Sequence, residues 1–74
     1  MVLKGFYVRV GHEFVVRIPE AGVLERNGDG EKAFVQAVET AKMQVEIFKR
    51  YGGKFSSKLK VNPPVGATLF TVKI

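Results

Sequence analysis

The chain has 74 residues, of which 46% are hydrophobic and 26% charged, a composition typical of one small globular domain spanning residues 1–74. It contains no cysteine, which excludes disulfides, thiol catalysis and cysteine-bound zinc. The net charge is +5, and all seven acidic residues lie within residues 1–46, whereas six of the twelve basic residues follow them. Such asymmetry favours a polyanionic partner such as nucleic acid.

The apolar runs, such as residues 14–16, are far too short to span a membrane, and the N-terminus lacks the apolar core of a signal peptide. We therefore expect a soluble, cytoplasmic protein with no membrane partner.

Residues 2–10 and 14–18 are rich in β-branched and aromatic side chains and predict a hairpin. A three-residue loop keeps apolar residues opposite one another throughout: Val10 with Phe14, Val8 with Val16 and Phe6 with Ile18. A two-residue loop would instead pair Phe6 with Arg17 and bring charge to the buried side. The sequence therefore favours the three-residue loop, although Gly11 comes first in it and a bulge glycine usually comes last.

Residues 19–30 begin with a proline, contain three glycines and predict a connection. Asp29 is expected to cap a helix that continues to Tyr51 and stops at Gly52. The apolar residues of this helix fall in one stripe, as expected for a helix that lies on a sheet. The stripe consists of Phe34, Ala37, Val38, Ala41, Val45 and Phe48.

Alternation of apolar and polar residues over 54–61 and 68–74 predicts a second hairpin, with Leu59 opposite Phe70. The predicted fold is α+β with the element order ββαββ: a four-stranded, mostly antiparallel sheet with one helix packed on one face. With the strands numbered along the chain, the orders 2-1-3-4 and 1-2-4-3 both keep neighbours antiparallel, and the sequence leaves both open.

The sheet face opposite the helix is expected to carry clustered cations and one aromatic residue. Lysine and arginine neutralise phosphates, and a tyrosine among them can stack on an exposed base. The expected nucleic-acid contacts are Tyr7, Arg9, Arg17, Lys54, Lys58, Lys60 and Lys73. The sequence thus predicts a small basic protein that binds the DNA or RNA backbone with low sequence specificity. A solvated sheet face whose lysines discourage edge pairing would explain the same residues.

The alternative function is a protein-binding inhibitor or adaptor with an acidic protein as partner, for example a viral protein that blocks a host enzyme. Met43, Ile47 and Tyr51 lie away from the apolar stripe of the helix and indicate a surface for a homodimer or another partner. Scattered exposed apolar residues are, however, normal on monomers.

No pattern in the sequence predicts an enzyme, a catalytic residue, a cofactor or a metal site. The single histidine, His12, lies in a predicted turn and has no evident partner. Residues 25–36 imitate a calcium loop, but Glu25 and Gln36 at its two ends are not the usual ligands. A glycine-rich turn that leads into a helix cap explains these residues without calcium.

Part of the chain follows a pattern of strand, proline, glycine and helix. The residues that carry it are 16–19, Gly22, Gly28, Asp29 and Ala33, followed by an alanine-rich helix. This pattern resembles that of the HicB antitoxin family over less than half of the chain. The glycine lies one residue closer to the proline than in the family, and the predicted elements lack the family's extra strand, so we carry no function over.

Overall fold

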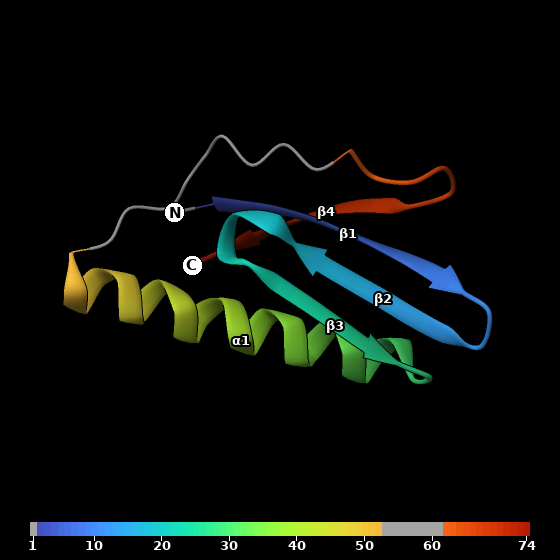
Figure 1. Cartoon of the computed structure of the whole chain (residues 1–74), viewed down its shortest axis with the longest axis horizontal. Helices are drawn as coiled ribbons and strands as arrows, with labels where there is room; N and C mark the ends of the chain where they lie inside the picture. Colours follow the sequence, from blue (N-terminus) through green and yellow to red (C-terminus); the bar gives the residue numbers. More distant parts are fainter. Residues whose placement is uncertain (1, 53–61) are drawn as a thin grey trace.

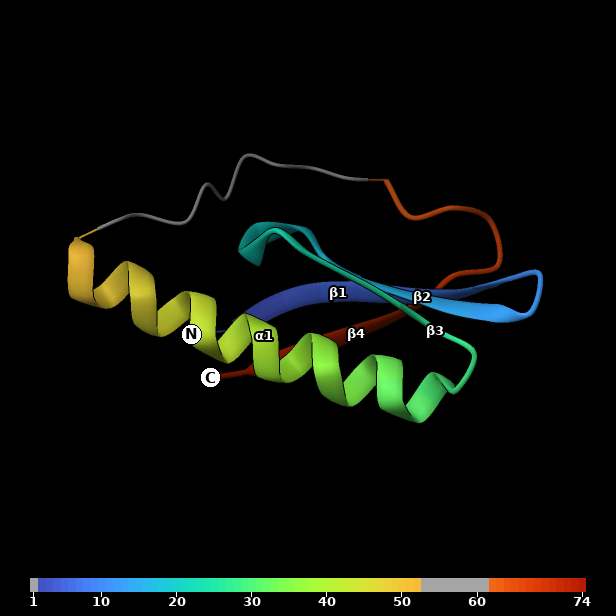
Figure 2. The same cartoon turned by 60° about the horizontal axis from the view of Figure 1, so that its bottom comes forward.

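The computed structural model describes residues 2–52 and 62–74. In these ranges the elements are β1 (Val2–Val10), β2 (Glu13–Ile18), the 3-10 turn η1 (Pro19–Ala21), β3 (Val23–Asn27), α1 (Gly30–Tyr51) and β4 (Thr68–Lys73). The strands form one antiparallel sheet in the order β3-β2-β1-β4, and α1 lies across one face of it (Figure 1, Figure 2). The predicted α+β class, with a four-stranded antiparallel sheet and one helix on one face, is confirmed.

The sequence did not predict β3. Residues 19–30, which were expected to form a connection, contain this strand. Pro19 begins a 3-10 turn, and Gly22 at φ 67° reverses the chain. The chain then pairs antiparallel with β2, with Val23 opposite Ile18. Val23 enters the core, whereas Glu25 and Arg26 give this edge strand a polar appearance in the sequence. The segment that resembles the HicB pattern therefore contains one strand more than the sequence revealed.

The position of the last strand also differs. β4 pairs with β1, with Leu3 opposite Val72 and Gly5 opposite Phe70. Both predicted strand orders are wrong, because neither places the first and last strands side by side. The strand predicted over residues 54–61, and with it the pairing of Leu59 with Phe70, lies outside the described residues.

The hairpin between β1 and β2 has a two-residue loop, so the predicted three-residue loop is wrong. Val10 lies opposite Glu13, and Phe6 lies opposite Arg17. Gly11 has φ 63° and His12 has no positive φ, which is the pattern of a type II′ turn with glycine first. The glycine at the first loop position therefore indicated the two-residue loop.

The change of register turns β1 over relative to β2, because a shift of one residue moves every side chain of a strand to the other face. β2 keeps its predicted orientation, with Val16 and Ile18 toward the helix. On β1 it is Leu3 and Tyr7 that share this face, since Tyr7 lies opposite Val16 and Leu3 belongs to the core. Phe6, which was expected under the helix, lies on the opposite face.

The predicted helix is confirmed at both ends. The Asp29 side chain accepts hydrogen bonds from the backbone of Glu31 and Lys32, and Gly52 ends the helix at φ 71°. The buried line along the helix consists of Ala33, Ala37, Ala41 and Val45. Three of these four side chains are methyl groups, so the helix axis can lie close to the sheet. Together with side chains of β1, β2, β3 and β4 they form the hydrophobic core.

Candidate functional site

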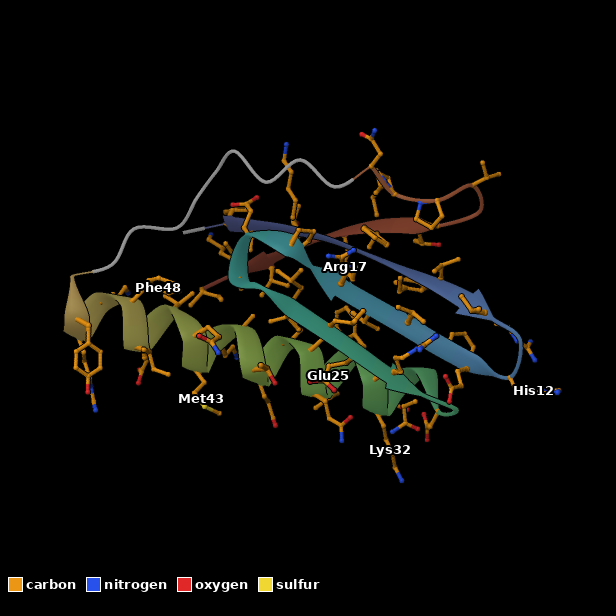
Figure 3. All side chains as sticks on the ribbon, viewed as in Figure 1. His12, Arg17, Glu25, Lys32, Met43 and Phe48 are labelled. Atoms are coloured by element: carbon orange, nitrogen blue, oxygen red, sulfur yellow. The ribbon has the colours of Figure 1, made fainter. Side chains whose placement is uncertain are left out.

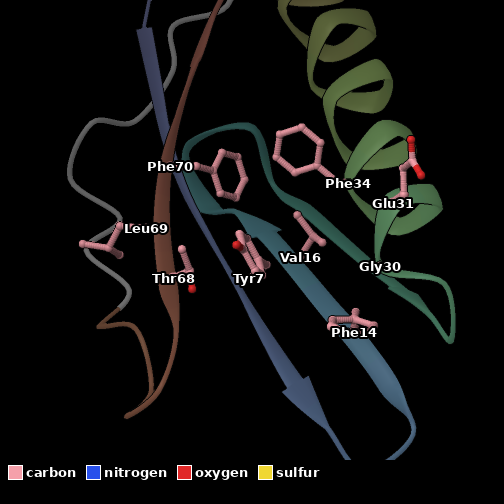
Figure 4. A pocket seen from close by; sticks show the side chains of 9 residues that line it. All are labelled: Tyr7, Phe14, Val16, Gly30, Glu31, Phe34, Thr68, Leu69 and Phe70. Carbon is pink, nitrogen blue, oxygen red and sulfur yellow. The ribbon is translucent and has the colours of Figure 1, made fainter.

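A groove lies on the helix side of the sheet, beside the first turns of α1. The helix packs mainly against β2 and β3, and the parts of β1 and β4 near the β1–β2 turn are not covered by it. The groove has a volume of about 570 Å³. It is lined almost entirely by apolar atoms of Tyr7, Phe14, Val16, Gly30, Glu31, Phe34, Thr68, Leu69 and Phe70 (Figure 4).

Three aromatic rings from three different elements meet in this groove. The Phe34 ring of α1 meets the Phe70 ring of β4 edge to face, with 5.0 Å between the ring centroids. The Tyr7 ring of β1 lies 6.3 Å from the Phe70 ring. Tyr7 and Phe34 each keep 37% of their surface exposed although they belong to this cluster. The cluster therefore leaves aromatic surface exposed to solvent while its rings hold one another in place.

A fourth aromatic ring, that of Phe14, extends the groove toward the hairpin turn. It packs under the start of the helix, where a Cβ on Gly30 would lie only 3.1 Å from the ring. The guanidinium carbon of Arg9 lies 5.8 Å from the centre of the same ring, and Arg9 Nε donates a hydrogen bond to the carbonyl oxygen of Gly11. Arg9 thus brings a positive charge to the end of the groove at Phe14. Glu31 brings a negative charge to the wall that α1 forms.

In the segment that resembles a calcium loop, the side chains of Asn27 and Asp29 accept hydrogen bonds from the backbone of the turn and of the first helical residues. The Asn27 side chain accepts a hydrogen bond of 2.9 Å from the backbone N–H of Asp29. Asp29 in turn accepts hydrogen bonds of 3.0 Å from Glu31 and 3.3 Å from Lys32. Within residues 2–52 and 62–74 no three His, Cys, Asp or Glu side chains gather as a metal site would require, and His12 is exposed in its turn.

The predicted nucleic-acid contacts do not come together as one surface. Tyr7 and Arg9 lie on the helix side of the sheet, whereas Arg17 and Lys73 lie on the surface opposite α1, which we call the open face. This face is not bare throughout, since Phe6 on it is only 5% exposed. The prediction that Tyr7, Arg9 and Arg17 share a face is wrong, because it rested on the three-residue loop. Lys54, Lys58 and Lys60 lie outside the described residues.

The open face nevertheless carries positive charge that the sequence did not predict there. Lys4 lies there through the true register of β1, and Arg26 lies there because β3 exists. Among the described residues of this face, four cations accompany one carboxylate: Lys4, Arg17, Arg26 and Lys73 with Glu13. Arg26 Nε lies 3.6 Å from a carboxylate oxygen of Glu13, with both side chains more than half exposed. Arg17 Nε is buried and has no hydrogen-bond partner among the described residues.

Met43, Ile47 and Tyr51 are exposed on the helix, as the sequence predicted. Figure 3 shows Met43 pointing away from the sheet. None of the three lines the groove. Their role as a partner surface stays a prediction.

The sequence pattern did not indicate Phe14, Phe34 and Phe70 as site residues, because their spacing predicts core positions. One signal was present in the helix. With alanine at two stripe positions, the helix has too little apolar volume to cover the large side chains of four strands. The helix therefore cannot cover all of these aromatic side chains, and some of them stay partly exposed.

Comparison with known protein families, with curated proteins and with solved structures finds no match to this chain. In the described ranges, no helical segment combines the length and apolarity needed to cross a bilayer.

Proposed function

We propose that the protein is a small protein-binding module, of the inhibitor or adaptor type, and that the aromatic groove beside α1 is its binding site. The observation that carries this proposal is the exposed cluster of Tyr7, Phe34 and Phe70 around an apolar groove. Aromatic anchors with a small polar rim are typical of the energetic centres of protein interfaces. Since Tyr7 and Phe34 are each 37% exposed, the groove is more open than the enclosed pockets that bury small ligands.

The rim of the groove supports a protein partner as well. Arg9 and Glu31 supply charges of opposite sign at its rim, and the hydroxyl groups of Tyr7 and Thr68 can exchange hydrogen bonds with a partner backbone. In the described part of the chain no acid, base and nucleophile converge on the groove. Binding without chemistry is therefore the activity that these residues support best.

Phe34→Glu is expected to abolish partner capture, because it places a carboxylate among the aromatic rings. Val35→Glu is the matched control, since Val35 is the next residue of the same helix, is exposed and does not line the groove. The measurement is affinity capture from the lysate of the encoding organism, followed by calorimetry with the purified partner. Wild type and Val35→Glu should bind alike, and Phe34→Glu should bind about tenfold or more weakly. The proposal fails if no captured protein depends on Phe34.

Nucleic-acid binding is a second candidate, which the excess of cations on the open face favours. If it is correct, Lys4→Glu combined with Lys73→Glu should weaken binding to random DNA or RNA about tenfold. It should also flatten the slope of log affinity against log salt by about 2. The control is Lys32→Glu with Lys42→Glu, which makes the same charge change on the helix. Fluorescence anisotropy at several salt concentrations measures the affinity and its salt dependence. Equal losses of affinity in the two double variants would reject a specific role for the open face.

A further inference from the structure

The two edges of the sheet differ in how they are protected. β3 carries Glu25, Arg26 and Asn27, and the hydroxyl group of Thr40 on the helix donates to a carboxylate oxygen of Glu25 at 3.5 Å. Charged side chains on an edge strand discourage pairing with other chains. β4 has no charged residue from Thr68 to Val72, and in the described ranges it pairs only with β1. Among the described residues, the edge of β4 is thus the one less protected by charge against a further strand.

The same strand forms one wall of the groove. Thr68 and Phe70 point to the helix side, because they lie opposite Tyr7 and Gly5 of β1. A strand added beside β4 would place every second side chain on this side, with its Cβ about 5 Å from that of Thr68 or Phe70. These side chains would extend the aromatic cluster and fill the groove from its β4 side. Backbone pairing and groove filling therefore belong to one binding mode.

The charges around β4 define the partner further. Lys4 and Lys73 lie on the open face at this side of the sheet, and Arg9 lies at the groove. Among the described residues that line the groove, Glu31 is the only one with a carboxylate. A partner segment that carries acidic residues complements this excess of positive charge. The β4 strand of a second copy cannot do so, because it contains a lysine and no acid. The complementary charge thus favours a different protein over a homodimer.

We propose that the protein binds an extended, acidic segment of a partner protein, which adds as a strand to the edge of β4 and inserts alternate apolar side chains into the groove. This inference rests on the proposed function and specifies the partner. Main-chain hydrogen bonds would supply much of the affinity in this mode, and the groove would supply the specificity.

The test is selection of displayed random peptides of about ten residues, long enough for one strand, against the full chain. We expect enriched peptides with apolar residues at every second position and Asp or Glu between them. On binding of a synthesised peptide, hydrogen exchange of β4 amides should slow relative to that of β3 amides. Leu69→Glu should weaken binding about tenfold or more through like-charge repulsion, as should Phe34→Glu. The control for Leu69→Glu is Leu24→Glu on the other edge strand, since Leu69 is 69% and Leu24 57% exposed. The register places both side chains on the open face, although Leu69 also borders the groove.

The outcomes separate this inference from the function on which it rests. Phe34-dependent peptides with helical spacing of apolar residues and no slowing at β4 would overturn strand addition and leave protein binding intact. Slow exchange of all β4 amides in the free protein would also overturn it, because the edge would then already be paired. A species of twice 8.2 kDa in sedimentation that Leu69→Glu dissociates would assign the edge to a second copy instead. Absence of any Phe34-dependent peptide would count against both proposals.

Discussion

Replacing Gly5 with alanine is expected to lower the free energy of unfolding by about 1–3 kcal/mol, the usual cost of overpacking a filled interior. Glycine inside a strand normally weakens it, so alanine would be stabilising on sequence grounds alone. In this fold, however, a Cβ on Gly5 would lie 2.6 Å from the backbone oxygen of Arg17 and 2.5 Å from Cζ of Phe70. The phenyl ring can rotate away, but the carbonyl oxygen belongs to β2 and moves only with that strand.

Gly28→Ala is the matched control for this prediction, because a Cβ there would meet only the backbone oxygen of His12, at 3.6 Å. Its effect should stay within about 0.5 kcal/mol. Urea unfolding followed by circular dichroism measures both variants. Equal stability of Gly5→Ala and wild type would show that the close approach of Phe70 and β2 to Gly5 is not a constraint. Since Phe70 also forms a wall of the groove, the variant should weaken partner binding as well.

Ile18→Ala is expected to cost about 2–5 kcal/mol of unfolding free energy, the range found when a large buried aliphatic side chain is truncated. Ile18 is 0% exposed and lies in the core where β2, the helix and η1 meet. The total stability of small domains is only about 5–15 kcal/mol, so this single change should remove a large fraction of it. It should lower the urea midpoint without much change in the slope of the transition.

Ile47→Ala makes the same chemical change on the helix surface, where Ile47 is 41% exposed. Its effect should stay within about 0.5 kcal/mol, since alanine also has the higher helix propensity. A loss for Ile47→Ala as large as that for Ile18→Ala would mean that the helix surface is buried in solution, for example by a dimer through Met43 and Ile47. Measurement at two protein concentrations separates that case, because a dimer gains stability with concentration.

The features predictable from the sequence are those that nearby residues decide. The helix, its Asp29 cap and its end at Gly52 follow from side-chain and backbone groups within one turn of one another. The strands β1, β2 and β4 follow from alternation within each segment. β3 was not predicted, because an edge strand of five residues buries few side chains. Only Val23 of V-L-E-R-N is fully buried.

The candidate site was less predictable, because its residues come from segments far apart in the chain. Tyr7, Phe34 and Phe70 meet only when β4 lies next to β1 and the helix crosses beside them. Nothing in the immediate neighbourhood of any of these residues encodes that meeting. The sequence predicted Tyr7 correctly as accessible, but for a surface shared with Arg17, which lies on the other side of the sheet.

By itself the sequence determined the α+β class, the long capped helix and the excess of positive charge, all of which depend on composition and short-range spacing. Only the tertiary structure decided which face of β1 lies under the helix, which strand neighbours which, and where aromatic surface remains uncovered. The physical reason is that side chains of a strand alternate with a period of two. One residue more or less in the hairpin loop therefore exchanges the buried and exposed faces, and the packing of the whole sheet chooses between them.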